Sequence, residues 1–338
     1  MITLQTRNRE AGRVFLLVML AIMLGTAAIL AESADDGVPE GCMIIEGDII
    51  VPIDFYESQG KQAWRENSWW PGGIIPYEFD TNVVSWQQDS MLAAMSVWES
   101  ISSIDFVERN GEADYVHILA TANTNSSWVG KKGGEQFVKI ASWNYRLIIA
   151  HELMHCVGFW HEQSRPARDS FVTVQIDSVY EGYGHNFDIH GDAGEWGYYD
   201  FTSIMHYDEC AFSICFCGPD ADCCCDSTGV GRTIIVKPEY SQYQSLLGNT
   251  DSVSYLDSMS TMFAYPPEPW WRFCSKDAGG LFPNGSFPDP FKTFLDGESG
   301  TPPGGVLWII APGEYNAAGL RKKPMILKAP LGGVVLTN

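Results

Sequence analysis

The 338-residue sequence predicts an α+β domain followed by a short β-rich tail. A helix is expected from Ser85, because Ser85 and Gln88 form a capping-box pattern and apolar residues follow at helical spacing. Beyond about residue 277 the chain is rich in Gly and Pro, which indicates a change of architecture. Short strand-like segments are predicted at 71–77, 104–107, 115–120 and 135–140.

The stretch HELMHCVGFWHEQSR indicates a metal site. His151 and His155 lie four residues apart and therefore share one helix face, with Glu152 beside them. Gly158 allows the helix to end and the chain to turn back, so that His161 can join the pair. Three neutral imidazoles leave the fourth tetrahedral position open for water, as in catalytic zinc sites. Histidines that only pack or hydrogen-bond are the alternative, but this spacing is the metzincin signature.

GFWHEQSR, together with SIMHY at 203–207, resembles the astacin family of zinc endopeptidases within the metzincin clan. The resemblance runs from Trp69 to Pro266. It implies a two-subdomain fold with a mixed twisted sheet and an active-site helix, a catalytic domain at 61–266, and one Zn2+ ion held by the three histidines. It also implies protein or peptide substrates, which would pair with an edge strand at 135–140.

The resemblance also implies roles for single residues. Glu152 would act as general base, and Tyr207 would stabilise the oxyanion of the transition state. Met205 would form the Met-turn below the imidazoles, and Glu162 would meet the amino terminus of the mature enzyme. An ordinary buried tyrosine and a solvated glutamate are the alternatives. The remaining histidines are interpreted as structural: His117, His185, His190 and His206.

An inhibitory prosegment is expected at 32–60, which makes the protein a zymogen. Its Glu46-Gly47-Asp48-Ile49 sequence resembles the astacin prosegment motif, in which an aspartate takes the water position on zinc. Asp48 is therefore the expected latency switch; an acidic turn in a linker, or Cys42 as the zinc-blocking residue, are the alternatives. Gly60-Lys61 offers a cleavage point for a trypsin-like activating protease.

The amino terminus has the order of a secretory signal peptide, predicted at 1–31. Three arginines precede an apolar run at 14–30, so a secreted, extracellular protein is expected. An uncleaved anchor is the alternative, and only that would bring a membrane into contact. The formal charge of −21 argues against nucleic acid as a partner.

Six of the nine cysteines lie between Cys210 and Cys225, where disulfide bonds are favoured over a second metal site. Cys156 is expected to be a buried core residue. The tail, 267–338, resembles the first rungs of a right-handed parallel β-helix but has room for only one or two. A secreted binding or adhesion protein with a vestigial or permanently blocked zinc domain is the alternative function.

Overall fold

The structure is a computed structural model that describes residues 38–55, 69–190, 196–215, 231–279, 283–318 and 323–337. The chain divides into two units, Met1–Glu40 and Gly41–Asn338, and every element below lies in the second. The predicted signal peptide, the Gly60-Lys61 junction and most of the cysteine cluster lie outside the described residues. Within the described ranges, no helix has the length and apolar character needed to cross a bilayer.

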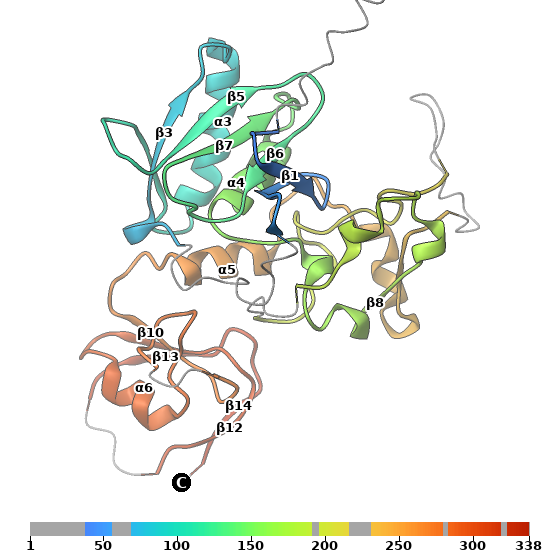
Figure 1. The fold of residues 1–338 in the computed structure, drawn as a ribbon. Helices are drawn as coiled ribbons and strands as arrows, with labels where there is room; N and C mark the ends of the chain where they lie inside the picture. Colours follow the sequence, from blue (N-terminus) through green and yellow to red (C-terminus); the bar gives the residue numbers. More distant parts are fainter. Residues whose placement is uncertain are drawn as a thin grey trace, which may run out of the picture. The chain divides into compact units, whose positions relative to one another are not determined.

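A seven-stranded mixed sheet forms the first half of the second unit (Figure 1), as the resemblance implies. Its order is β1-β2-β6-β7-β5-β3-β4. Strands β4, β3, β5 and β7 run parallel to one another, whereas β6 is antiparallel to β7. The strands are β1 (Cys42–Ile45), β2 (Ile49–Pro52), β3 (Ile74–Phe79), β4 (Asp105–Glu108), β5 (Tyr115–Ala120), β6 (Ser126–Trp128) and β7 (Glu135–Ile140).

Two helices, α3 (Ser85–Glu99) and α4 (Arg146–Cys156), share one hydrophobic core with this sheet. Trp98 is fully buried, and its indole N–H donates to the Ala150 carbonyl oxygen at 3.0 Å, which ties α3 to α4. The expected cap at Ser85 is wrong by one residue: Val84 is the N-cap, and its amide donates to the Gln87 side chain. Valine has no side-chain oxygen, so only half of the reciprocal hydrogen bonding of a capping box is made.

The expectation that 135–140 is an edge strand is also wrong. β7 pairs with β5 on one side and with β6 on the other, so it lies inside the sheet. On this side of the sheet β6 is the outermost strand of the expected catalytic domain, and β2 from the predicted prosegment pairs with β6 in parallel at Ser127 and Trp128. The predicted prosegment therefore covers this edge.

The second half of the domain has little regular structure. β8 (Val172–Val174) pairs antiparallel with β9 (Ile234–Val236), and aromatic side chains surround the pair. Helix α5 (Tyr255–Ala264) begins at the N-cap Ser254, whose hydroxyl accepts from the Asp257 amide. The short 3₁₀ helices are η1 (Pro71–Gly73), η2 (Glu162–Ser164), η3 (Arg168–Ser170), η4 (Ile176–Ser178), η5 (Gly184–Phe187) and η6 (Pro238–Leu246). The strand predicted at 71–77 thus begins only at Ile74, after η1.

The tail contains short parallel strands and one helix, α6 (Phe294–Gly300). β10 (Trp271–Cys274), β11 (Val306–Ile309) and β13 (Ile326–Lys328) form one sheet, and β12 (Gly313–Asn316) pairs with β14 (Val334–Thr337). The parallel β-helix remains a prediction for this segment.

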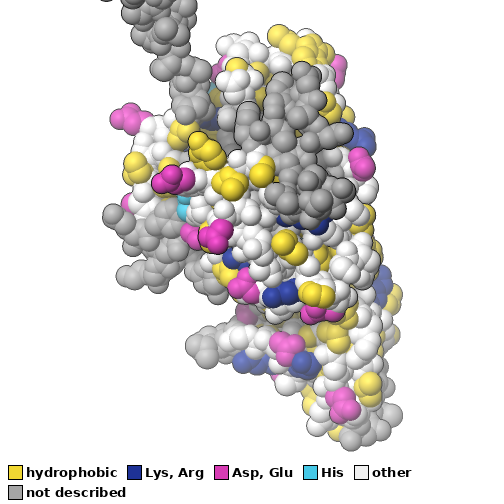
Figure 2. Space-filling model, turned by 90° about the vertical axis from the view of Figure 1, so that its right-hand side faces the viewer, with side chains coloured by type: hydrophobic (Ala, Val, Ile, Leu, Met, Phe, Trp, Pro, Cys, Tyr) yellow, Lys and Arg dark blue, Asp and Glu magenta, His cyan; other side chains and the backbone are white. Residues whose placement is uncertain are grey.

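On the face in Figure 2, acidic side chains are scattered over the described residues, with lysine and arginine side chains among them.

The cysteines divide by their surroundings. Cys210 is disulfide-bonded, in line with the interpretation of the cluster. Cys156 and Cys274 are buried free thiols. Burial raises the pKa of Cys156 to about 12, so this thiol between the metal-site histidines is an unreactive core residue, as expected.

Candidate active site

The three predicted histidines converge on one point. Helix α4 supplies His151 and His155 from one face and ends at Cys156. Gly158 follows with a φ of +117°, a conformation that glycine adopts readily and other residues rarely adopt. The chain then returns to place His161 with its Nε2 atom 3.4 Å from Nε2 of His151. His155 and His161 are almost completely buried. The reversal at Gly158 is therefore what completes the site.

Each imidazole is oriented by an oxygen acceptor at Nδ1. His151 contacts the Ile204 carbonyl oxygen at 2.6 Å, and His155 contacts the Phe159 carbonyl oxygen at 2.7 Å. His161 contacts the Glu46 carboxylate at 2.6 Å. Carbonyl and carboxylate oxygens only accept, so each Nδ1 carries the proton and each Nε2 lone pair is free for a metal.

The donor atoms fit zinc. Asp48 joins the three histidines, with its Oδ2 atom 3.2 Å from Nε2 of His151 and 3.4 Å from Nε2 of His161. Ligands at about 2.0–2.1 Å from zinc in tetrahedral array lie about 3.3–3.4 Å from one another. Two further atoms, His155 Nε2 and Asp48 Oδ1, are buried without a hydrogen-bond partner, as ligands aimed at an ion are. The expected cofactor, one Zn2+ ion, matches this donor set.

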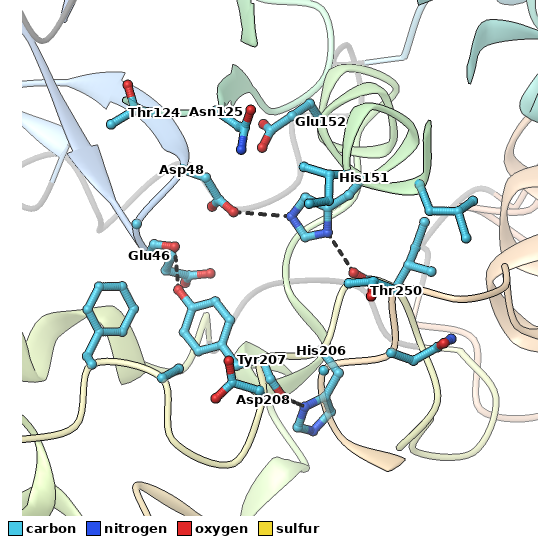
Figure 3. Close-up of a pocket in the computed structure, with 18 of the residues that line it drawn as sticks. Glu46, Asp48, Thr124, Asn125, His151, Glu152, His206, Tyr207, Asp208 and Thr250 are labelled. Carbon is cyan, nitrogen blue, oxygen red and sulfur yellow. Dashed lines mark hydrogen bonds and ion pairs between the residues drawn. The ribbon is translucent and has the colours of Figure 1, made fainter. Parts of the chain in front are cut away.

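Glu152 lies beside the metal site on the wall of a cavity of about 410 Å³ (Figure 3). Its side chain is 1% exposed, and its Oε2 atom has no hydrogen-bond partner. Burial raises the pKa of Glu152 well above its usual range, and the nearby charge of Asp48 adds to this shift. A buried carboxylate of this kind binds a proton more readily than an exposed one, and it lies beside the metal-site histidines.

The predicted Met-turn at 203–207 lies against the histidines. Met205 is buried in the same hydrophobic core as α4, and its carbonyl oxygen accepts from the Glu162 amide at 2.9 Å. Asp257 on α5 holds the turn, because its carboxylate accepts from the Ser203 hydroxyl at 2.6 Å and from the Ile204 amide at 3.0 Å. Since the Ile204 carbonyl orients His151, Asp257 acts on the metal site through this turn.

Tyr207 follows the Met-turn, and its ring lies 4.7 Å from the His161 ring, measured between centroids. The Tyr207 hydroxyl donates to the backbone carbonyl oxygen of Glu46, as Figure 3 shows. The neighbouring His206 is buried, with its Nδ1 donating to the Tyr207 carbonyl and its Nε2 accepting from Tyr199. Burial lowers the pKa of His206 to about 4, which agrees with its interpretation as a structural residue.

The segment that carries Asp48 is a hairpin of β1 and β2, and its tip enters the site. The Asp48 carboxylate points toward His151 in Figure 3. Burial opposes ionisation, but the surrounding histidines hold the pKa of Asp48 well below its usual range. Asp48, and not the alternative Cys42, belongs to the group of possible metal ligands in the described residues.

The Glu46 carboxylate at the same tip is 1% exposed and contacts His161, His190 and Ser164. Burial opposes its ionisation, but the hydrogen bonds from His161 and His190 outweigh this effect and lower the pKa of Glu46 to about 2. Sequence reasoning gave Glu46 no role and treated His190 as structural. The one sequence signal for Glu46 is its place beside Gly47 and Asp48 in the prosegment-like motif, and no local pattern points to its contact with His190.

Glu162 is partly buried close to Met205, with its side chain 16% exposed, and borders a small cavity of about 50 Å³. Its Oε1 atom accepts from the Arg165 guanidinium and from the Asp200 amide, each at 2.8 Å. Burial raises the pKa of Glu162 to about 7, although these two partners favour the ionised form and lower it. The carboxylate is thus hydrogen-bonded and largely shielded from solvent, which disfavours the alternative of a solvated surface residue. Its role as partner of the mature amino terminus remains a prediction, because residues 61–68 lie outside the described ranges.

The fold and the donor set together define a metzincin-like zinc domain. The family model for Astacin, a family of peptidases, matches residues 62–266, more than half of the chain. The chain belongs to this family.

Individual relatives agree with this assignment. Zinc metalloproteinase nas-6 of Caenorhabditis elegans is 38% identical over 168 residues, which cover 48% of this chain and 46% of that protein. Tolloid-like protein 2 of Mus musculus is 39% identical over 150 residues, covering 43% of this chain and 15% of that protein. The chain thus spans less than half the length of these relatives.

A solved structure is also similar. High choriolytic enzyme 1, a hatching-enzyme zinc protease from Oryzias latipes, matches with a TM-score of 0.51 and 28% sequence identity. The match covers 60% of this chain and 96% of that structure. The matched share of this chain is thus close in length to its zinc domain.

Proposed function

We propose that this chain is a secreted zinc-dependent endopeptidase that is made as a latent proenzyme and hydrolyses protein or peptide substrates. One observation carries the proposal: the β1–β2 hairpin pairs with β6 and carries Asp48 to the metal-site histidines. A hairpin bound in this way occupies both the sheet edge that would bind a peptide and the ligand position that water would need.

Zinc, when bound, supplies the Lewis acidity that activates a water molecule and polarises the scissile carbonyl. Glu152 is placed to act on that water, since it is buried beside the histidines with one carboxylate oxygen unpartnered. Its carboxylate accepts the proton of the attacking water and then returns it to the leaving amine.

Tyr207 is the second catalytic residue of the proposal. Its hydroxyl already donates to a peptide carbonyl oxygen, that of Glu46, within the same cleft. In the reaction it would donate in the same manner to the oxygen on which negative charge develops. Substrate backbone would pair with β6, where β2 now pairs, and this pairing would hold the scissile bond over the histidines.

Activation requires removal of residues 32–60. A trypsin-like activating protease hydrolyses the bond after a lysine, so at the Gly60-Lys61 junction it would cut after Lys61, and the new amino terminus would bind Glu162. The partly buried carboxylate of Glu162 now has Arg165 as its cationic partner, so an ammonium group could join an anion that is already stabilised. Secretion is supported by the signal-like segment at 1–31 and by the disulfide-bonded Cys210, since disulfides persist in oxidising compartments.

The test compares the full-length chain with the same chain trimmed by trypsin, using a denatured protein as substrate and mass spectrometry to locate the cuts. We expect internal cuts only after trimming, and none in the presence of a zinc chelator. Glu152→Gln should keep the metal and the fold but lower kcat at least about 100-fold, because the proton acceptor is lost. Bound zinc and near-UV circular dichroism provide the controls for folding.

Two results would contradict the proposal. Trimmed, zinc-loaded and folded protein that makes no cuts would revive the binding or adhesion function. Substantial turnover by Glu152→Gln would overturn the assignment of the general base.

A further inference from the structure

The tip of the β1–β2 hairpin has an unusual backbone. Glu46 has φ of +50° and Gly47 has φ of +80°, so both adopt the left-handed conformation. This conformation is unfavourable for a glutamate and persists where the surroundings hold the residue in place. The turn directs the side chains on both sides of Gly47 into the active-site cleft.

The surroundings that hold Glu46 belong to the catalytic domain. Its Oε2 atom lies 2.6 Å from Nδ1 of His161, and its Oε1 atom lies 2.9 Å from the Ser164 hydroxyl and 2.5 Å from Nε2 of His190. Its backbone carbonyl accepts from Tyr207. A buried carboxylate is tolerated only when its oxygens are paired, and here every one of these partners lies outside the prosegment.

Two of these partners have no part in binding zinc. Ser164 and His190 lie behind His161, and the His190 ring packs on Trp160 with 4.1 Å between ring centroids. Phe55 of the predicted prosegment, which follows β2, contacts both Trp160 and His190. The contact between Glu46 and His190 therefore depends on aromatic packing outside the metal ligands, whereas Asp48 contacts the metal-site histidines themselves.

We propose that Glu46 is a second latch of the prosegment, fastened by His190 and Ser164, which holds the hairpin in the cleft alongside Asp48. The inference rests on the proposed latency. Because Glu46 lies in the segment that activation would remove, it adds to inhibition and takes no part in the reaction of the trimmed enzyme. Loss of the latch would loosen the hairpin even where no metal is bound.

The experiment uses full-length Glu46→Gln, Asp48→Asn and Asp54→Asn. Asp54 provides the matched control, because it is an exposed prosegment carboxylate. Two quantities are measured: cleavage of a quenched peptide before and after trimming, and hydrogen exchange of the hairpin amides with zinc bound and after chelation. A trimmed Glu46→Gln enzyme has the wild-type sequence, so its activity provides an internal control for folding.

We expect untrimmed Glu46→Gln to show at least tenfold higher activity than the untrimmed wild type, with equal activity after trimming. Its hairpin amides should exchange at least tenfold faster with and without zinc, while Asp54→Asn should match the wild type. His190→Gln should reproduce the faster exchange, and adding Glu46→Gln to it should have a smaller effect than in the wild type. His190→Gln also serves as the test if Glu46→Gln does not fold.

The failures of the two proposals can be told apart. An untrimmed wild-type chain that is as active as the trimmed one would overturn latency itself. If the wild type is latent and Asp48→Asn is active, but Glu46→Gln keeps wild-type latency and exchange, only the second latch is wrong.

Discussion

Replacing Asp257 by alanine should destabilise the domain and weaken zinc binding together. Asp257 is 4% exposed, and its carboxylate accepts from the Ser203 hydroxyl and from the amides of Ile204 and Ser254. Alanine leaves these three donors without their acceptor, at about 1–3 kcal/mol for each buried group. We expect the free energy of unfolding to fall by about 3 kcal/mol, which is about 1 kcal/mol for each of the three donors. This is the low end of the range, because burial raises the pKa of Asp257 and the buried carboxylate is itself unfavourable in the wild type.

The assay is urea unfolding of the full-length, zinc-loaded chain, with Asp251→Ala as the matched control on an exposed aspartate. Zinc affinity is measured in parallel by competition with a chelating dye. It should fall about 10-fold or more, because the Ile204 carbonyl that orients His151 is no longer held in place. A change in unfolding free energy below about 1 kcal/mol, equal to that of the control, with unchanged zinc affinity, would refute this reasoning.

Three further predictions concern the metal, the turn and the pH. Chelation should lower Tm, because zinc at about 100 times its Kd stabilises the fold by about 2.7 kcal/mol; a Tm insensitive to zinc would contradict this. Gly158→Ala should cost at least about 1 kcal/mol in urea unfolding, because φ is +117° and the new Cβ would lie 3.3 Å from the Trp69 ring. Gly111→Ala, at φ of +97° with open space around it, should cost less, and an equal cost would rule out crowding against Trp69. His206 has a pKa of about 4 in the folded state, below its ordinary value near 6.5, so only the unfolded state gains a proton between these values and stability falls as pH falls through this window. The fall attributable to His206 is about 3 kcal/mol between about pH 7 and pH 4, and it should disappear in His206→Gln but remain in His185→Gln, as measured by urea unfolding at each pH.

The proposed latency depends on the edge of the sheet. β6 would be an open edge once the prosegment is removed, and open edges pair readily with extended chains. In the structure β2 pairs with that edge through its backbone, while Asp48 and Glu46 reach the imidazoles and His190 through their side chains. In the proposed latent state, one short hairpin would thus block both the binding of a peptide backbone and access of water to the metal.

The sequence by itself determined the metal site, because the spacing of His151, His155 and His161 around Gly158 is a local property of one helix and its turn. It also indicated Asp48 through the resemblance of its motif. What required tertiary structure were the contacts between distant segments. Glu46 is paired with His190, 144 residues away, and Asp257 with Ser203, 54 residues away.

The place of β7 inside the sheet was likewise decided by pairing with β6, which no periodicity within 135–140 could reveal. Strand order and the partners of buried carboxylates depend on which segments the folded chain brings together. The spacing of residues within one segment can be read from the sequence, whereas contacts between distant segments appear only in the tertiary structure.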